Sequence, residues 1–271
     1  TWTRLSRVDE VAVADESRTV RARGRAVDPK DVPPQVELMQ DGSASTLLTD
    51  YTGHPGALSL IDGTLFSAAV RLRPGAKVLV IGVGGGDDVW AAVRQGARHV
   101  RGVDLHAPMI AAHGPAGRGW TRAWGKRVSL SVAEGRSTLM RDDERYDVVQ
   151  MTGIDTWAAV TSGAYALVEN TLYTTEAFSQ MMERLAPGGV LQVVRMAAQM
   201  ETLRVLTHVD AASLGRRTVP LAQAVIVLGA VDHLVATLVR LDGFSEGEVH
   251  SVRTWAAESG LDVLHLPGHE M

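Results

Sequence analysis

The sequence predicts an α/β protein with a doubly wound, mostly parallel β-sheet and a small β-rich unit before it. From Lys77 onward, apolar runs alternate with helical patterns, as in parallel sheets whose strands are joined by helices. A glycine cluster at residues 82–86 follows the first of these runs. The alternation ends in two apolar runs joined by a tight turn at residues 229–233, which indicates a late antiparallel strand.

Composition narrows the classes of function. The chain has 271 residues, of which 45% are hydrophobic, enough for a packed core. Its net charge of −4 argues against a nucleic-acid-binding surface, and the absence of cysteine excludes disulfides and thiolate metal sites. The most apolar long run, Pro220 to Val239, carries Asp232 and His233, which are costly in a bilayer. We therefore expect a cytoplasmic protein with no membrane span in this chain and no nucleic-acid partner.

The first part of the chain is expected to be a separate unit. We predict an N-terminal β-hairpin unit over residues 1–70 and a larger domain over residues 71–271, because the α/β alternation begins only after Arg73-Pro74-Gly75. The loose alternation of apolar and polar residues, together with turn residues, predicts the elements of the first unit. They are a hairpin over 8–27, a loop over 28–34, strands over 36–39 and 45–49 around the turn at Asp41-Gly42, and a helix over 58–72.

The larger domain is divided by its hydrophobic periodicity and its turn residues. Strands are expected over 78–81, 100–104, 128–132, 146–151, 190–194, 222–228, 234–241 and 263–266. Helices are expected over 88–95, 175–185, 200–214 and 246–259.

The glycine cluster is the first candidate binding feature. Gly82, Gly84 and Gly86 satisfy G-x-G-x-G, whereas Asp87 stands where the dinucleotide fingerprint needs a third glycine. Glycines let a backbone approach a ligand closely, and a helix N-terminus offers free N–H groups to it. The alternative is a tight turn without a ligand. We favour a ligand site, because four glycines in five positions weaken a turn without helping its packing.

Two acids follow the next strands. Asp104 ends the strand over 100–104 and can accept hydrogen bonds from ribose hydroxyls, and Glu134 follows the strand over 128–132 and can accept from an adenine amino group. Either could instead be a solvated surface acid. Because the carboxyl ends of parallel strands meet at one edge of a sheet, the two acids and the glycine cluster reinforce one another as a nucleoside site.

The segment after the strand over 146–151 is expected to face the second substrate. Carboxylates and tyrosines there could hold a cationic amine or deprotonate a nucleophile. The alternative is an ordinary helical lid with packed tyrosines and solvated acids. The candidate residues are Thr152, Asp155, Tyr165, Glu169 and Tyr173.

Other chemistries find no support in the sequence. His106 and His113 lie seven residues apart and no third ligand has a defining spacing, so no metal site is expected. The sequence has neither a G-x-S-x-G elbow nor a Walker lysine, which argues against a serine hydrolase and a P-loop nucleotidase.

Six segments follow one another along the chain in a recognisable order: VLVIGVGGGDDV, VDL, AEGR, RYDVVQMTGIDTWA, ENTLYTTEAF and LAPGGVLQV. In this order they resemble the spermidine synthase family, and more closely its bacterial spermidine-synthase-like members. The resemblance covers roughly Asp41 to Gly243 and depends on the order of the segments rather than on any one of them. The resemblance implies the class I S-adenosylmethionine-dependent superfamily, with a seven-stranded, methyltransferase-like Rossmann fold.

The resemblance also implies a reaction and a set of contacts. Spermidine synthases transfer the aminopropyl group of decarboxylated S-adenosylmethionine to putrescine. We therefore expect S-adenosylmethionine or its decarboxylated form as co-substrate, a polyamine or other small amine as acceptor, and a possible homodimer. By resemblance, Asp104 would bind ribose, Glu134 adenine, and Asp87 the aminopropyl amine. The methionine-derived tail would lie along Gly82, Gly84 and Gly86.

Two departures from the family pattern affect the chemistry. The family has D-S-x-D after the fourth strand; here Thr152 replaces the first aspartate, which helps to deprotonate the amine, and Asp155 retains the second. The family's L-D-G-x-x-Q segment keeps Asp41 and Gly42 but has Ser45 in place of glutamine. A threonine hydroxyl is no general base near neutral pH.

The sequence thus supports more than one hypothesis. The first is a transferase of an aminopropyl or related alkyl group, in which Asp155 with Tyr165 or Glu169 orients or deprotonates the acceptor. A methyltransferase and a non-catalytic nucleoside-binding regulatory module are the alternatives. A nicotinamide-dependent dehydrogenase is a further hypothesis, and the missing third glycine of the dinucleotide fingerprint argues against it.

Overall fold

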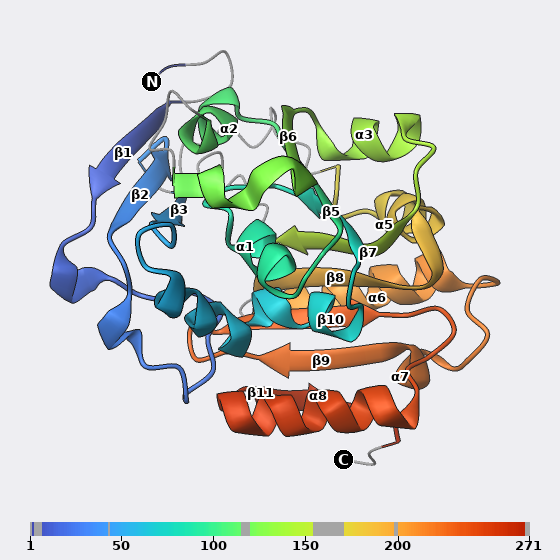
Figure 1. Cartoon of the computed structure of the whole chain (residues 1–271). Helices are drawn as coiled ribbons and strands as arrows, with labels where there is room; N and C mark the ends of the chain where they lie inside the picture. Colours follow the sequence, from blue (N-terminus) through green and yellow to red (C-terminus); the bar gives the residue numbers. More distant parts are fainter. Residues whose placement is uncertain are drawn as a thin grey trace.

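The computed structural model describes residue 2 and residues 7–42, 44–114, 120–153, 171–197 and 200–268. These residues form an eight-stranded sheet in the order β11-β9-β10-β8-β7-β4-β5-β6 and a three-stranded sheet in the order β1-β2-β3 (Figure 1). The large sheet comprises β4 (Lys77–Ile81), β5 (His99–Asp104), β6 (Val128–Val132), β7 (Tyr146–Thr152), β8 (Leu185–Met196), β9 (Val225–Gly229), β10 (Leu234–Val239) and β11 (Asp262–His265).

The direction of the strands confirms the predicted sheet. The strands β6, β5, β4, β7 and β8 are parallel, whereas β10 lies antiparallel between β8 and β9. The resemblance implies seven strands, and the described residues form eight. The additional strand is β11, which pairs antiparallel with β9 at the edge of the sheet.

Helices cover both faces of the large sheet. They are α1 (Asp87–Arg94), α2 (Ala107–His113), α3 (Gly135–Arg141), α5 (Thr175–Glu183), α6 (Glu201–Ser213), α7 (Leu221–Ala224) and α8 (Glu246–Ser259). Alternate residues of β4 point to opposite faces, as the pleat requires. Val78 and Val80 belong to the apolar cluster that includes residues of α1 and α8, whereas Leu79 and Ile81 belong to the cluster that includes residues of α3, α5 and α6. The sheet is therefore doubly wound, with one apolar core on each face.

The element boundaries differ from the expected ones in a few places. Three helices have no counterpart among the expected elements: α2, α3 and the short α7, and α7 moves the start of β9 to Val225. The strand β8 begins at Leu185, five residues before the expected start, and extends to Met196. The other expected strands and helices of the large domain are present within a few residues.

The expected hairpin over 8–27 is wrong. The strands of the small sheet are β1 (Val8–Ala12), β2 (Gln35–Gln40) and β3 (Ala44–Thr49), and β1 pairs with β2 rather than with its own continuation. Between β1 and β2 lie two 3-10 turns, η1 (Asp15–Ser17) and η2 (Pro29–Asp31). The backbone here finds distant partners: the amide of Ala22 donates to Asp232 Oδ2 at 2.8 Å, and that of Arg25 to the carbonyl of Gly260 at 2.9 Å.

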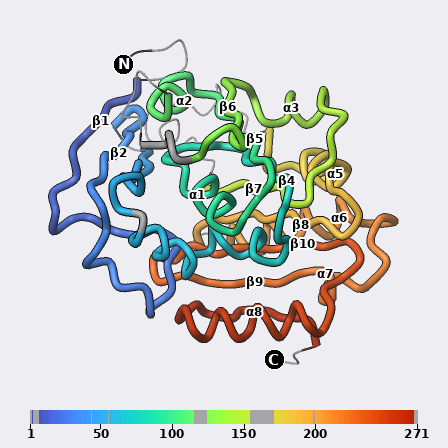
Figure 2. Tube along the Cα trace, in the orientation of Figure 1, coloured from blue at the N-terminus to red at the C-terminus, as the bar shows by residue number. Residues whose placement is uncertain are grey.

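The expected α-helix over 58–72 is instead three 3-10 segments, η3 (Pro55–Gly63), η4 (Leu65–Ser67) and η5 (Val70–Leu72). Tertiary contacts account for the interruption. The amide of Leu65 donates to the carbonyl of Ala22 at 2.8 Å, and the amide of Ala69 to the buried side chain of Gln192 at 2.9 Å. Figure 2 follows this segment from the small sheet past α1 into β4.

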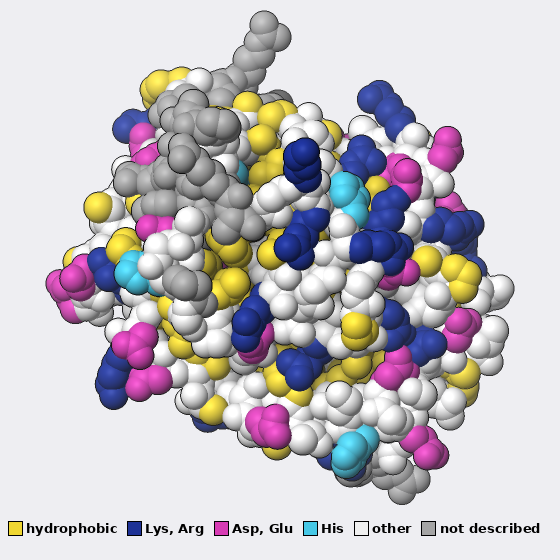
Figure 3. Space-filling model, in the orientation of Figure 1, with side chains coloured by type: hydrophobic (Ala, Val, Ile, Leu, Met, Phe, Trp, Pro, Cys, Tyr) yellow, Lys and Arg dark blue, Asp and Glu magenta, His cyan; other side chains and the backbone are white. Residues whose placement is uncertain are grey.

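The surface carries both signs of charge. Acidic and basic side chains are interspersed over the face drawn in Figure 3, and exposed or half-exposed pairs such as Arg94 with Asp62 lie 2.9 Å apart. Among the described residues, no helix combines the length and the apolar stretch needed to cross a membrane.

Candidate functional site

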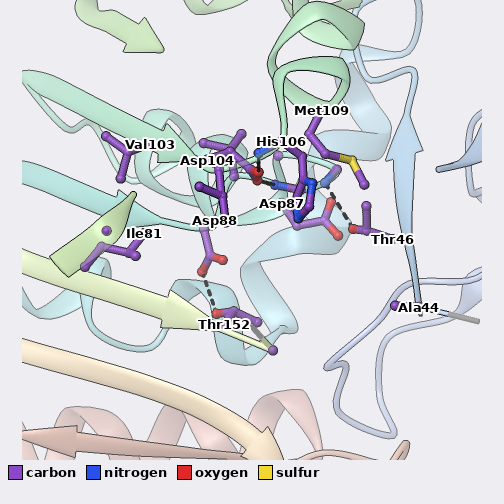
Figure 4. Close-up of a pocket in the computed structure, with 18 of the residues that line it drawn as sticks. Ala44, Thr46, Ile81, Asp87, Asp88, Val103, Asp104, His106, Met109 and Thr152 are labelled. Atoms are coloured by element: carbon purple, nitrogen blue, oxygen red, sulfur yellow. Dashed lines mark hydrogen bonds between the residues drawn. The ribbon is translucent and has the colours of Figure 1, made fainter. Parts of the chain in front are cut away.

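A cavity of about 330 Å³ lies at the carboxyl ends of β4, β5 and β7, where open α/β sheets bind ligands (Figure 4). Its volume is in the range of small-molecule pockets. The structure brings seven of the predicted site residues to this cavity: Gly82, Gly84, Gly86, Asp87, Asp104, Glu134 and Thr152. One wall comes from the small sheet, through Ala44, Ser45 and Thr46 at the start of β3.

The glycine loop between β4 and α1 needs its glycines for two reasons. Gly82, Gly84 and Gly86 have φ angles of 80°, 48° and 89°, in the left-handed region that favours glycine. Gly85 has an ordinary φ, but a Cβ there would overlap the carbonyl oxygen of Leu47 on β3. Three glycines therefore set the turn, and the fourth lets the small sheet approach it.

Asp104 ties the loop to the end of β5. Its Oδ2 accepts from the amide of Gly84 at 3.0 Å, and its Oδ1 from the amide of His106 at 2.8 Å. The side chain is buried and lines the cavity. A carboxylate oxygen accepts more than one hydrogen bond, so both oxygens retain capacity for a pair of hydroxyl donors.

Glu134 caps the helix α3. Its two oxygens accept from the amides of Arg136 and Ser137 at 2.8 and 2.6 Å. Burial alone would raise the pKa of Glu134, but these N–H groups and the positive charge of Arg136 hold its pKa below the ordinary value. The side chain is thus an ionised acceptor at the cavity edge, and its capping role was not foreseen from the sequence.

Two acids begin α1 and line the cavity together. Burial raises the pKa of Asp87 to about 7, against the opposing charge of Arg21. Burial also raises the pKa of Asp88 to about 7; a hydrogen bond from Thr152 opposes this rise and the charge of Asp87 adds to it. Helix N-termini stabilise negative charge, which favours acids at these positions. The site therefore contains two carboxyl groups that change protonation near neutral pH.

Sequence reasoning missed Asp88 and Arg21. The signal for Asp88 was its position two residues after Gly86, in the first turn of α1, together with the polar Gln150 in the apolar strand β7. The structure joins these two, because Gln150 Nε2 donates to Asp88 Oδ1 at 3.2 Å. Arg21 comes from the irregular segment between β1 and β2, where no pattern marked it. Its Nη1 donates to the carbonyl of Ser45 at 3.0 Å, and the side chain lines the cavity.

The predicted acceptor-side residues divide into two groups. Asp155, Tyr165 and Glu169 lie outside the described residues. Tyr173 packs against Arg195 at the end of β8: the guanidinium lies 4.3 Å from the ring centroid, and its Nη1 donates to the phenol oxygen at 3.2 Å. In the described part of the chain, Tyr173 is a neighbour of that arginine rather than a residue that lines the cavity.

Among the residues that the structure describes, no cluster of side chains that could bind a metal ion is present. Within the described ranges, no three His, Asp or Glu side chains are grouped as metal ligands would be. Asp87 and Asp88 are two carboxyl groups without a third such ligand beside them in this part of the chain.

Comparison with known proteins identifies the fold. No family model and no curated protein sequence matches this chain. Among solved structures, it is similar to the spermidine synthase from Thermotoga maritima, with a TM-score of 0.52, 12% identity, and coverage of 88% of this chain and 79% of that chain.

Two further structures give the same result. A spermidine synthase in complex with the transition-state analogue AdoDATO matches with a TM-score of 0.51 and 12% identity, covering 82% of this chain and 74% of that one. A putative SAM-dependent methyltransferase from Streptococcus mutans matches with a TM-score of 0.50 and 17% identity, covering 77% of this chain and 53% of that one. At these identities the likeness shows the shared fold, the Rossmann-like α/β fold of S-adenosylmethionine-dependent methyltransferases.

Proposed function

We propose that this protein is a transferase whose co-substrate is an adenosyl sulfonium and whose acceptor is a small amine. The observation that carries the proposal is the buried carboxylate of Asp104, which the amides of Gly84 and His106 fix at the cavity edge. A carboxylate that can accept hydrogen bonds from ribose hydroxyls, placed beside a glycine turn, suits a nucleoside whose tail extends along the loop. The shared fold with spermidine synthases and methyltransferases supports the same class.

The remaining contacts follow from the geometry of the cavity. Glu134 offers an ionised carboxylate, which can accept from the adenine amino group without losing its helix cap. Asp87 lies at the start of α1, next to the loop that would hold the tail. A cationic amine on the tail would favour the ionised form of Asp87 and lower its pKa from the value of about 7.

The reaction we propose first is the transfer of an aminopropyl or related alkyl group. The acceptor nitrogen attacks the carbon bound to the sulfonium, and the C–S bond breaks towards sulfur. Positioning and exclusion of water would supply most of the rate enhancement. The two carboxyl groups of Asp87 and Asp88 support this reaction, because both substrates carry ammonium groups. Asp155, which the resemblance marks for the acceptor, remains a candidate contact.

A methyltransferase is the second candidate, and Arg21 is the observation that favours it. S-adenosylmethionine carries a carboxylate that its decarboxylated form lacks. Arg21 lines the cavity, and its positive charge acts on Asp87. A cation and an anion placed together would match the carboxylate and the ammonium group of an intact methionine tail.

Calorimetry and product analysis test both candidates. We expect methylthioadenosine and S-adenosylhomocysteine to bind. The substitution Arg21→Gln should weaken the binding of S-adenosylhomocysteine at least tenfold more than that of methylthioadenosine. Incubation of each sulfonium with a panel of amines should release methylthioadenosine for aminopropyl transfer or S-adenosylhomocysteine for methyl transfer, as read by mass spectrometry. Binding without any product would favour the non-catalytic module. Absence of binding would overturn the proposal, and a thermal shift with NAD would favour the dehydrogenase.

A further inference from the structure

The end of β7 carries a hydroxyl where the resemblance expects an acid. Thr152 occupies the position of the first aspartate in the family's D-S-x-D segment. The hydroxyl of Thr152 donates to Oδ1 of Asp88, 3.1 Å away, so a carboxylate from α1 lies one hydrogen bond from that strand end (Figure 4). The helix α1 therefore supplies a carboxylate next to the position on β7 at which the resemblance expects one.

Neutral groups hold Asp88 in place. Only 4% of the residue is exposed, and the same Oδ1 accepts from Gln150 Nε2 at 3.2 Å. The amide of Gln150 also donates to the carbonyl of Phe66 at 2.8 Å, which fixes its orientation. A buried acid is costly unless it is paired or used. Because these hydrogen-bond donors are uncharged, they do not offset the free energy that burial of the charged carboxylate costs.

Asp88 also reaches the substrate side of the cavity. It lines the cavity together with Thr152 and Gly153 at the end of β7, where the segment expected to face the acceptor begins in the sequence. Asp104 and Glu134, the proposed nucleoside contacts, come from the ends of β5 and β6. The acid on α1 therefore lies on the side of the cavity away from the proposed adenine contact.

We infer that Asp88 is the proton acceptor for the attacking amine, and that it supplies from α1 the carboxylate that Thr152, at the end of β7, lacks. This inference rests on the proposed function. Thr152 and Gln150 are positioning residues: their hydrogen bonds hold the carboxylate and leave it ionisable.

The proton and the electrons balance in this scheme. Asp88 takes one proton from the acceptor ammonium and becomes a neutral carboxylic acid, which frees the nitrogen lone pair. That lone pair forms the new N–C bond, and the electron pair of the C–S bond stays on sulfur, which leaves as a neutral thioether. The nitrogen, neutral after deprotonation, gains the positive charge that the sulfonium loses, and Asp88 then releases its proton to water.

The ionisation of Asp88 suits this role. Burial raises the pKa of Asp88 to about 7, and a general base is most effective when its pKa lies near the working pH. Turnover should therefore rise with pH through about 7, as the carboxylate forms. Other charged groups share the cavity, so the pH profile has to be read as a difference between variants. They are Arg21, Asp87, Asp104, His106 and Glu134.

The test uses Asp88→Asn and the double variant Asp88→Asn/Thr152→Asp, which moves the acid back to the strand. We expect Asp88→Asn to lower kcat about 100-fold or more. We also expect it to keep the Kd for methylthioadenosine within about threefold and to lose the rise in kcat near pH 7. The kcat of the double variant should be at least tenfold higher than that of Asp88→Asn. Asp142→Asn is the matched control, because Asp142 is a buried acid that pairs with Arg101 and is not among the residues that line the cavity; this variant should keep its kcat.

The outcomes separate the two proposals. An active wild type with an active Asp88→Asn variant, or an unchanged pH profile in that variant, would overturn the role of Asp88 alone. So would a double variant no faster than Asp88→Asn, or loss of methylthioadenosine binding along with activity. A wild type that neither binds methylthioadenosine nor forms an adenosyl product would overturn the proposed function itself, and with it the role of Asp88.

Discussion

The amide of Gly84 donates to Oδ2 of Asp104 at 3.0 Å, so the glycine loop after β4 and the acid that ends β5 form one unit. The carboxylate thus has a structural role in the glycine loop as well as its proposed role towards ribose. A change at Asp104 alters both the ligand contact and the loop that would hold the ligand's tail.

Asp104→Ala should abolish nucleoside binding. We expect the Kd for methylthioadenosine to rise at least 100-fold by calorimetry, because the variant loses the ribose acceptor and the bond to the Gly84 amide together. Asp104→Asn keeps one acceptor oxygen and should lie in between. Asp262→Ala, which removes an exposed ion pair with Arg25, serves as the control and should bind as the wild type does. Equal affinity of all three variants would mean that the nucleoside binds elsewhere.

Gly85→Ala should destabilise the fold. The new Cβ would overlap the carbonyl oxygen of Leu47, so the loop or β3 has to move, at a cost of about 1–3 kcal/mol. Urea denaturation measures the change. Gly247→Ala on α8 is the matched control, because a Cβ there meets nothing within 4 Å. A Gly85→Ala variant as stable as this control would contradict the close approach of β3.

Asp88→Asn should make the protein more stable at pH 8 and leave it unchanged at pH 4. In the folded state, the pKa of Asp88 is raised to about 7, above its ordinary value of 3.8. The wild-type acid therefore costs stability progressively as pH rises from about 4 to 7, whereas the amide does not titrate. The gain is at most about 4 kcal/mol. Thermal unfolding at both pH values tests this. A larger gain in stability at pH 4 than at pH 8 would mean that the pKa of Asp88 is not raised in the folded state.

Glu134→Gln should show the opposite pH dependence. The pKa of Glu134 lies below its ordinary value, so the ionised cap stabilises the fold at neutral pH and this contribution is lost as pH falls through the folded pKa. We expect a loss of about 1 kcal/mol at pH 7 and a smaller one at pH 3. Denaturation curves at the two pH values give the comparison. A loss that does not depend on pH would mean that the cap does not need its charge.

The sequence predicted the large sheet well because its strands carry strong local signals. Each expected apolar run of the large domain forms a strand, and the glycine turn, Asp104 and Glu134 meet at one edge. The predictions of a hairpin over 8–27 and a helix over 58–72 were wrong for a common reason. Their backbone groups bond to Asp232, Gly260 and Gln192, which lie more than a hundred residues away in sequence. No local pattern encodes such partners.

The candidate site was only partly predictable for the same reason. A motif marks residues that share a loop or a strand end, such as Gly82 and Asp104. It does not show that Thr152 would bond to an acid from α1, or that Arg21 would reach the cavity from an irregular segment. These contacts depend on tertiary placement.

The close approach of β3 to the glycine loop also constrains how the protein responds to its ligand. Thr46 Oγ1 accepts from the amide of Gly85 at 3.0 Å, so a wall of the cavity belongs to the small sheet. Any molecule that orders the loop must also favour the docked position of that sheet, and by thermodynamic linkage the docked sheet must favour the molecule. Occupancy of the nucleoside site and amide-exchange protection of residues 35–49 are therefore two readouts of one equilibrium.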